Sequence, residues 1–163
     1  DAWKREQVGE QWYLGDTINL SIGQGYLLVS PTQVHSSISL IASGGTWCPY
    51  VFEQGHKSTC TRYEINAEHL QLVRAGMRAA CSMGGTAYPF FNYKVQGRTI
   101  GIACKTGTAE STAKTEDPHA WFTAFAPAGN PSITITVLVE HGGEGSGVAA
   151  PIAKAVLDAY FSQ

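Results

Sequence analysis

The sequence has little that would suit a membrane span, a nucleic acid or a metal. Its apolar runs all fall well short of the roughly 18 residues that cross a bilayer. Charged residues make up only 15% and the formal net charge is −2, which argues against proteins that bind nucleic acid or anionic membranes through a basic surface. Neither a C-x-x-C nor an H-x-x-x-H pair occurs, so we expect no zinc site, and no cofactor or other metal is implied.

The first residues also lack the apolar segment of a signal peptide. We therefore expect any membrane anchor to lie on a longer parent chain. What is present is typical of a globular protein, because 163 residues with 44% hydrophobic content can bury the core of one domain.

The residue pattern predicts two helices, three strands and a last helix. The first 20 residues are polar, with scattered aromatic side chains and no clear period, and are interpreted as loop and connector. Ser30 can cap the first helix with Pro31 in its first turn, and Asn66 can cap the second. The strands are expected at 98–105, 120–126 and 132–140, and the last helix from Val148 to about Phe161.

Short connections between these strands suit antiparallel neighbours, so the predicted fold class is α+β, an antiparallel sheet with packed helices. Residues 46–63 look like an irregular excursion. Cys48 and Cys60 lie within it and could pair in an oxidising compartment, whereas Cys81 and Cys104 are interpreted as buried free thiols.

The most informative stretch is Lys105-Thr106-Gly107-Thr108, hereafter the Lys-Thr-Gly-Thr segment, at the end of the first predicted strand. It offers one ammonium, two hydroxyl groups and an unobstructed backbone to one small space, which suits a peptide-like substrate with a carboxylate. Taken alone, it could equally be an exposed lysine beside two threonines that favour a strand.

Several motifs in a fixed order resemble class B penicillin-binding proteins, most of all the elongation-type penicillin-binding protein 2. They are Gly15-Asp16, then Ile22-Gly23-Gln24-Gly25 leading to Ser30-Pro31-Thr32-Gln33, Gly84-Gly85-Thr86-Ala87, Lys105-Thr106-Gly107-Thr108-Ala109-Glu110, His119-Ala120-Trp121-Phe122 and Val139-Glu140. Each motif is weak alone, but the ordered set, which runs from about residue 15 to the end, is specific.

The resemblance implies a peptidoglycan D,D-transpeptidase domain with the fold of penicillin-binding proteins and serine β-lactamases. In that family the nucleophilic Ser-x-x-Lys and the Ser-x-Asn triplet precede the Ile-Gly-Gln-Gly stretch. Residues 1–163 are therefore expected to be the C-terminal portion of a single transpeptidase domain, inactive without its upstream half.

The resemblance also implies roles for the Lys-Thr-Gly-Thr segment. Lys105 would orient the serine of Ser-x-Asn, and Thr106 and Thr108 would bind the terminal carboxylate of the substrate. The Thr108 N–H would form half of the oxyanion hole. Gly107 would let the substrate lie close to the strand.

The implied partners are peptidoglycan stem peptides, β-lactam antibiotics and the upstream half of the same domain. The parent would be membrane-anchored on the extracytoplasmic face of a bacterial cell and would work with a glycosyltransferase. Two alternatives are a serine β-lactamase of the same superfamily and a sensor that only captures β-lactam.

Four other features of the sequence are not assigned a catalytic role. Ser111-Thr112-Ala113-Lys114 is a literal Ser-x-x-Lys but follows the strand and is taken as a chance match. Residues 142–147 are expected to be a flexible turn. His119 is placed at the rim of a cleft. The aromatic residues Tyr88, Phe90 and Phe91 could be a lip for substrate or a packing cluster.

Overall fold

The computed structural model describes residues 2–51, 55, 58–110 and 116–163. The chain divides into two compact units, Asp1–Ser30 and Pro31–Gln163, which are described separately. Among the helices described, none combines the length and the apolar character that crossing a membrane requires.

The N-terminal unit contains two helices, α1 (Ala2–Val8) and α2 (Leu14–Ser21), so the prediction of a loop over residues 1–20 was wrong. The Lys4 ammonium, almost fully buried, donates to the Asp16 carboxylate at 2.7 Å. The same carboxylate oxygen accepts the N–H of Tyr13 at the start of α2. These bonds lower the pKa of Asp16, with the hydrogen bond from Lys4 as the largest cause. The Asp16 carboxylate therefore both caps α2 and joins it to α1. The spacing of apolar residues along the sequence does not reveal such contacts.

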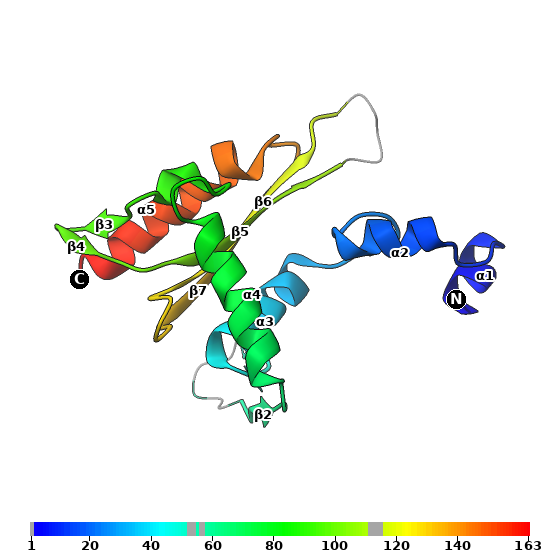
Figure 1. The fold of residues 1–163 in the computed structure, drawn as a ribbon, viewed down its shortest axis with the longest axis horizontal. Helices are drawn as coiled ribbons and strands as arrows, with labels where there is room; N and C mark the ends of the chain where they lie inside the picture. Colours follow the sequence, from blue (N-terminus) through cyan, green and yellow to red (C-terminus); the bar gives the residue numbers. More distant parts are fainter. Residues whose placement is uncertain (1, 52–54, 56–57, 111–115) are drawn as a thin grey trace. The chain divides into compact units, whose positions relative to one another are not determined.

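The second unit is built on an antiparallel sheet of three strands in the order β5-β6-β7 (Figure 1). Their bounds are β5 (Ala103–Ala109), β6 (His119–Ala126) and β7 (Ile133–Val139). The second and third predicted strands are thus confirmed, and so is the α+β class.

The first predicted strand, 98–105, is wrong in its bounds. Residues Arg98–Thr99 form β4, which pairs with β3 (Lys94–Val95) in a small hairpin. Gln96 and Gly97, with φ of 49° and 78°, make the two-residue turn between them. Since β5 begins only at Ala103, the Lys-Thr-Gly-Thr segment lies inside a strand and not at its end.

Two long helices precede the sheet and one follows it: α3 (Pro31–Ser43), α4 (Ala67–Ala80) and α5 (Ala150–Phe161). The first two agree with the prediction, and the Asn66 side chain accepts the N–H groups of Glu68 and His69 as the cap of α4. The last helix begins two residues later than expected, because residues Gly145–Ala149 form a π-helical turn, η2.

Two hydrophobic clusters lie on the two faces of the sheet. On one face Cys104, Phe122 and Ala124 pack with Leu157 of α5. On the other face Ala103 and Phe125 pack with Ile38 of α3 and Met77 of α4. Since neighbouring residues of one strand belong to different clusters, the sheet has helices on both sides and the side-chain alternation of a regular strand.

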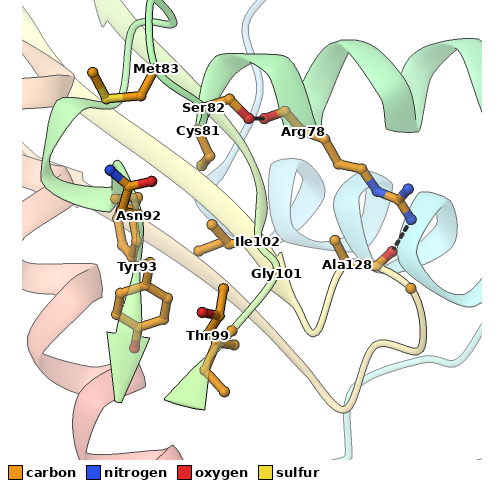
Figure 2. Close-up of a pocket in the computed structure, with 13 residues that line it drawn as sticks. Arg78, Cys81, Ser82, Met83, Asn92, Tyr93, Thr99, Gly101, Ile102 and Ala128 are labelled. Atoms are coloured by element: carbon orange, nitrogen blue, oxygen red, sulfur yellow. Dashed lines mark hydrogen bonds between the residues drawn. The ribbon is translucent and has the colours of Figure 1, made fainter. Parts of the chain in front are cut away.

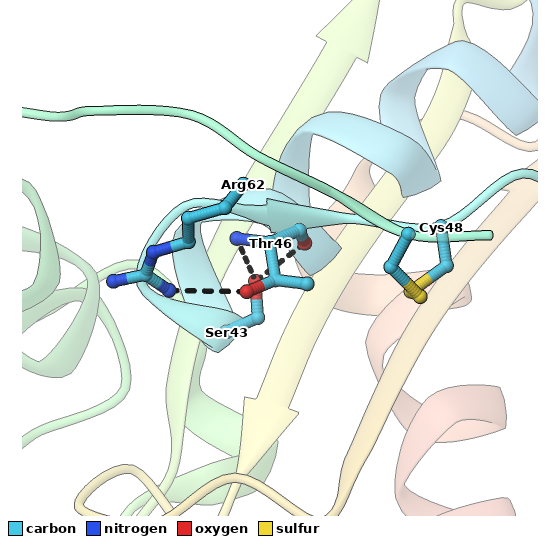
Figure 3. Close-up of a disulfide and its surroundings, with 5 residues drawn as sticks. Ser43, Thr46, Cys48 and Arg62 are labelled. Carbon is cyan, nitrogen blue, oxygen red and sulfur yellow. Dashed lines mark hydrogen bonds between the residues drawn. A yellow bond between two sulfur atoms is a disulfide. The ribbon is translucent and has the colours of Figure 1, made fainter.

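The four cysteines form two disulfides. Cys48–Cys60 agrees with the predicted pair and lies next to a two-stranded ladder of β1 (Thr46–Trp47) and β2 (Thr61–Arg62) (Figure 3). The Ser43 hydroxyl at the end of α3 donates to the Thr46 carbonyl at 2.7 Å, which holds the ladder against the helix.

The interpretation of the other two cysteines as free thiols was wrong. Cys81, the C-cap of α4, is joined to Cys104 of β5, with 5.9 Å between their Cα atoms. Both side chains are buried, as expected, but sequence spacing could not show that helix and strand bring them together.

Candidate active-site strand

The Lys-Thr-Gly-Thr segment occupies the middle of β5, an outer strand of the three-stranded sheet. Lys105 pairs with Thr123 and is two residues from Ala103, which places it on the face covered by α3 and α4. Thr106 pairs with Phe122 and is two residues from Cys104, which places it on the α5 face. The strand therefore directs the lysine and the two threonines to opposite faces, and the single cluster of donors expected from the sequence is divided.

Lys105 is exposed at its side chain, and its ammonium donates to the carbonyl of Thr106. Its neighbour Cys104 is fully buried, which confirms the burial expected from the sequence. The disulfide to Cys81 thus ties the residue directly before Lys105 to the end of α4.

The loop at residues 84–87 reaches the Lys-Thr-Gly-Thr segment through Thr86. The hydroxyl of Thr106 donates to the hydroxyl oxygen of Thr86 at 2.9 Å. Gly85 is required for this placement, since a Cβ there would lie 2.3 Å from the carbonyl oxygen of Ala79. The structure therefore brings two of the quoted motifs together and places Thr86, which sequence reasoning did not single out, beside the candidate site.

Gly107 packs closely against two other parts of the chain. A Cβ at Gly107 would lie 3.1 Å from the Cβ of Trp121, its partner on β6. Gly145, at the start of η2, lies so near that a Cβ there would be 2.4 Å from the Gly107 carbonyl oxygen. Residues 142–147 therefore include a closely packed position, and the expectation of a merely flexible turn was wrong for Gly145.

Aromatic side chains near the segment divide between core and surface. Phe90 is buried and stacks on Phe122, with ring centroids 5.1 Å apart, so it belongs to a packing cluster. Tyr88 is exposed and is available to be the lip considered above. Trp121 is half-buried on the Lys105 face, opposite to the buried Phe122, as alternation predicts.

A cavity lies beside the strand that carries the Lys-Thr-Gly-Thr segment, and its lining does not include that segment. It has a volume of about 670 Å³ and runs along residues 99–102, before β5 begins (Figure 2). Arg78 lines it but already donates to the carbonyl of Ala128 at 2.8 Å, and Ser82 donates to the Arg78 carbonyl. The Tyr93 hydroxyl, from another residue of the lining, is buried without a hydrogen-bond partner among the residues that the structure describes. The cavity includes none of the four predicted site residues.

In the ranges that the structure describes, no group of three or more His, Cys, Asp or Glu side chains is placed to hold a metal ion. The Ser-x-x-Lys at residues 111–114 lies outside the described residues.

Comparison with known proteins gives a consistent result. The peptidoglycan D,D-transpeptidase MrdA of Haemophilus influenzae is 32% identical over 189 aligned positions, which cover 99% of this chain and 28% of that protein. A solved complex of penicillin-binding protein PBP2 with MreC from Helicobacter pylori is 36% identical, with a TM-score of 0.81 over 98% of this chain and 29% of that one.

A third relative, penicillin-binding protein A of Mycobacterium tuberculosis, was solved as an imipenem acyl-enzyme complex. It is 29% identical, with a TM-score of 0.64, and the match covers 88% of this chain and 33% of that one. The chain thus spans about 28% of the length of its MrdA relative. Since the profile of the penicillin binding protein transpeptidase domain also matches residues 3–158, the chain belongs to that family, as a PBP2/MrdA-like class B member.

Proposed function

We propose that this chain is part of a peptidoglycan D,D-transpeptidase and supplies one wall of its active site, the Lys-Thr-Gly-Thr segment. The observation that carries the proposal is the placement of that segment on an outer strand, tied by Thr106 to Thr86 of a second motif. An outer strand offers backbone groups to an extended peptide, which is the shape of a stem peptide.

In the proposed reaction, a serine outside this sequence attacks the peptide carbonyl before the terminal D-Ala of a stem. The serine oxygen bonds to the carbonyl carbon, the C–N bond breaks, and the hydroxyl proton leaves on the amine of D-Ala. The amine of a neighbouring stem then attacks the acyl carbon and forms the C–N bond of the cross-link. The ester C–O bond to the serine breaks, and the serine oxygen takes the proton that the amine loses.

The segment contributes to this reaction mainly by electrostatics. The Thr108 N–H is proposed as one donor of the oxyanion hole, where the loss of a single donor typically costs about 10²–10³ in rate. The exposed Lys105 ammonium favours the negative charge that develops nearby and orients a serine hydroxyl of the upstream half. Thr106 and Thr108 are assigned to the substrate carboxylate.

Thr86 extends the carboxylate assignment. Because Thr106 donates its hydroxyl hydrogen to Thr86, the hydrogen of Thr86 itself is left to donate onward. A carboxylate bound beside the two threonines would receive that bond.

The proposed partners are stem peptides, β-lactams, the upstream half of the domain, and a glycosyltransferase beside a membrane-anchored parent. Two disulfides support an extracytoplasmic location, since such bonds persist in oxidising compartments.

Covalent labelling with fluorescent penicillin tests the proposal. We expect the full-length parent to be labelled and residues 1–163 alone to remain unlabelled. Lys105→Ala should slow labelling of the parent by about 10² or more, as loss of a group that acts on proton transfer does. Lys94→Ala, a change at an exposed lysine of β3, is the matched control.

Three results would count against the proposal. A parent that is never labelled would remove the transpeptidase assignment, and rapid turnover of penicillin would favour the β-lactamase alternative. An adduct on Ser111, located by mass spectrometry of digested peptides, would show that the nucleophile lies within this chain.

A further inference from the structure

His119 opens β6 on the same face of the sheet as Lys105. It pairs with Ala109, and it is six residues before Phe125, which packs with α3 and α4 on that face. Its half-buried imidazole therefore lies beside the C-terminal end of the Lys-Thr-Gly-Thr strand.

The imidazole of His119 holds a turn that comes from elsewhere in the chain. Its Nδ1 accepts the backbone N–H of His141 at 3.1 Å, so this nitrogen carries no hydrogen. Gly143 donates its N–H to the carbonyl of Pro118 at 2.9 Å. The Nδ1 of His141 lies 3.2 Å from the carbonyl oxygen of Asp117 and, because a carbonyl can only accept, carries a hydrogen. Residues 117–119 are thus bonded to residues 141–143.

The backbone of this turn is held in an uncommon conformation. His141 has φ of 51° and Gly143 has φ of 81°, in the left-handed region that a histidine seldom adopts. The bonds to His119, Pro118 and Asp117 help to keep it there, together with the bond from the Gly142 N–H to the Val139 carbonyl and the contact of His141 with the Glu116 carboxylate.

The same turn leads directly to the Lys-Thr-Gly-Thr segment. Two residues after Gly143, Gly145 packs on the backbone of β5 and β6, with the carbonyl oxygens of Trp121 and Gly107 at 2.2 and 2.4 Å from where a Cβ would stand. The Gly107 carbonyl carbon is bonded to the Thr108 nitrogen. A shift of the turn would therefore change the direction of the Thr108 N–H.

We infer that His119 is a positioning residue for the oxyanion donor, acting through its Nδ1 acceptor, the turn at residues 141–143 and Gly145. The inference rests on the proposed function, because it assigns a role relative to the Thr108 N–H. His119 itself need not touch the substrate.

The test uses the full-length parent protein and measures two quantities for a fluorescent penicillin, its dissociation constant before acylation and the acylation rate constant. His119→Leu removes the acceptor, and His119→Asn keeps one, since the Asn Oδ1 can take the place of Nδ1. His69→Leu, the same change at an exposed histidine of α4, is the matched control.

We expect His119→Leu to lower the acylation rate constant about tenfold, less than the full loss of an oxyanion donor, with the dissociation constant unchanged within about twofold. His119→Asn should recover the rate to within about threefold of the wild type, and His69→Leu should match the wild type. Thermal unfolding of each variant checks that it is folded.

The inference is overturned if His119→Leu acylates at the wild-type rate, if Leu and Asn are equally slow, or if only the dissociation constant changes. If His119→Leu does not fold, His119→Gln replaces it: its amide oxygen lies one methylene too far, so a rate equal to that of His119→Asn overturns the inference. A wild-type parent that is never acylated contradicts the proposed function and not the role of His119 alone.

Discussion

At the scale of residues, the alternation of side chains along β5 determines how the Lys-Thr-Gly-Thr segment can act. Lys105 and Gly107 face the α3 and α4 side, whereas Thr106 faces the α5 side and bonds to Thr86. A substrate that contacts the lysine and both threonine hydroxyls must therefore lie along the outer edge of the strand, where side chains from both faces can reach it.

Thr86→Val should lower the rate of penicillin acylation by about fivefold, because a hydrogen bond between neutral groups contributes roughly 0.5–1.5 kcal/mol. Valine keeps the shape of threonine but removes the hydroxyl that Thr106 donates to. Acylation kinetics of the parent would measure the effect, with Thr86→Ser as the variant that keeps the hydroxyl. Equal rates for Val and Ser would show that the Thr86–Thr106 bond has no part in the reaction.

His35 gives a prediction for the dependence of stability on pH. Burial between α3 and β7 lowers its pKa below the ordinary 6.5, and its ring nitrogens lie 3.0 and 3.3 Å from the hydroxyls of Thr136 and Thr134. As pH falls below 6.5, the unfolded chain binds a proton that the folded chain does not, so the free energy of unfolding decreases.

Urea unfolding at pH 7 and pH 5 would measure this decrease. His35→Gln has no group that titrates in this range and should show a smaller decrease between the two pH values than the wild type. An equal decrease in both proteins would mean that His35 is not the source.

At the scale of elements, the π-helical turn η2 acts as a support for β5. Gly145→Ala should destabilise the fold by about 2 kcal/mol. Its Cβ would clash with backbone oxygens of β5 and β6, which can move only if the strands themselves shift. It should also slow acylation, because the displaced turn no longer packs on Gly107. Gly147→Ala, in the same turn, meets only the Tyr88 hydroxyl at 3.6 Å and should stay within about 0.5 kcal/mol of the wild type. Chemical denaturation compares the two, and equal stabilities would contradict the packing argument.

Elements with a strong local signal could be predicted from the sequence, and those that depend on distant contacts could not. Asn66 marks the start of α4 because its cap is made within three residues. The helices α1 and α2 were missed, since Lys4 and Asp16, twelve positions apart, join them. Residues 98–105 were wrongly predicted to form one strand, because Gln96-Gly97 forms a hairpin turn that pairs Arg98–Thr99 with a strand of only two residues.

The candidate site shows the same division. The Lys-Thr-Gly-Thr segment was found from its residue types and from its place in an ordered set of motifs. Thr86 and Gly145 were not assigned to the site, because each meets the segment only after a helix or a strand has turned back on the sheet.

At the scale of the whole second unit, the disulfide between Cys81 and Cys104 links the end of α4 to β5, next to the site. Cys104 packs in the α5 cluster, whereas Met77, four residues before Cys81, packs in the cluster on the other face. Cys81 itself packs in the same cluster as Cys104, so the bond ties the C-terminal end of α4 to β5 on the α5 face of the sheet. Its position, one residue before Lys105, couples the stability of the fold to the placement of the lysine.

Removal of either disulfide should lower the stability by about 3 kcal/mol. The sequence separations are 12 and 23, and the entropy of closing a loop depends only weakly on its length. The double change Cys81→Ala and Cys104→Ala should cost more than Cys48→Ala with Cys60→Ala, because it also leaves space in a buried cluster. Only the loss of Cys81–Cys104 should slow penicillin acylation, since Cys48 and Cys60 lie beside β1 and β2 and not beside the Lys-Thr-Gly-Thr segment. Calorimetry and acylation kinetics of the two double variants would decide this, and equal rates would show that Lys105 is held without the bond.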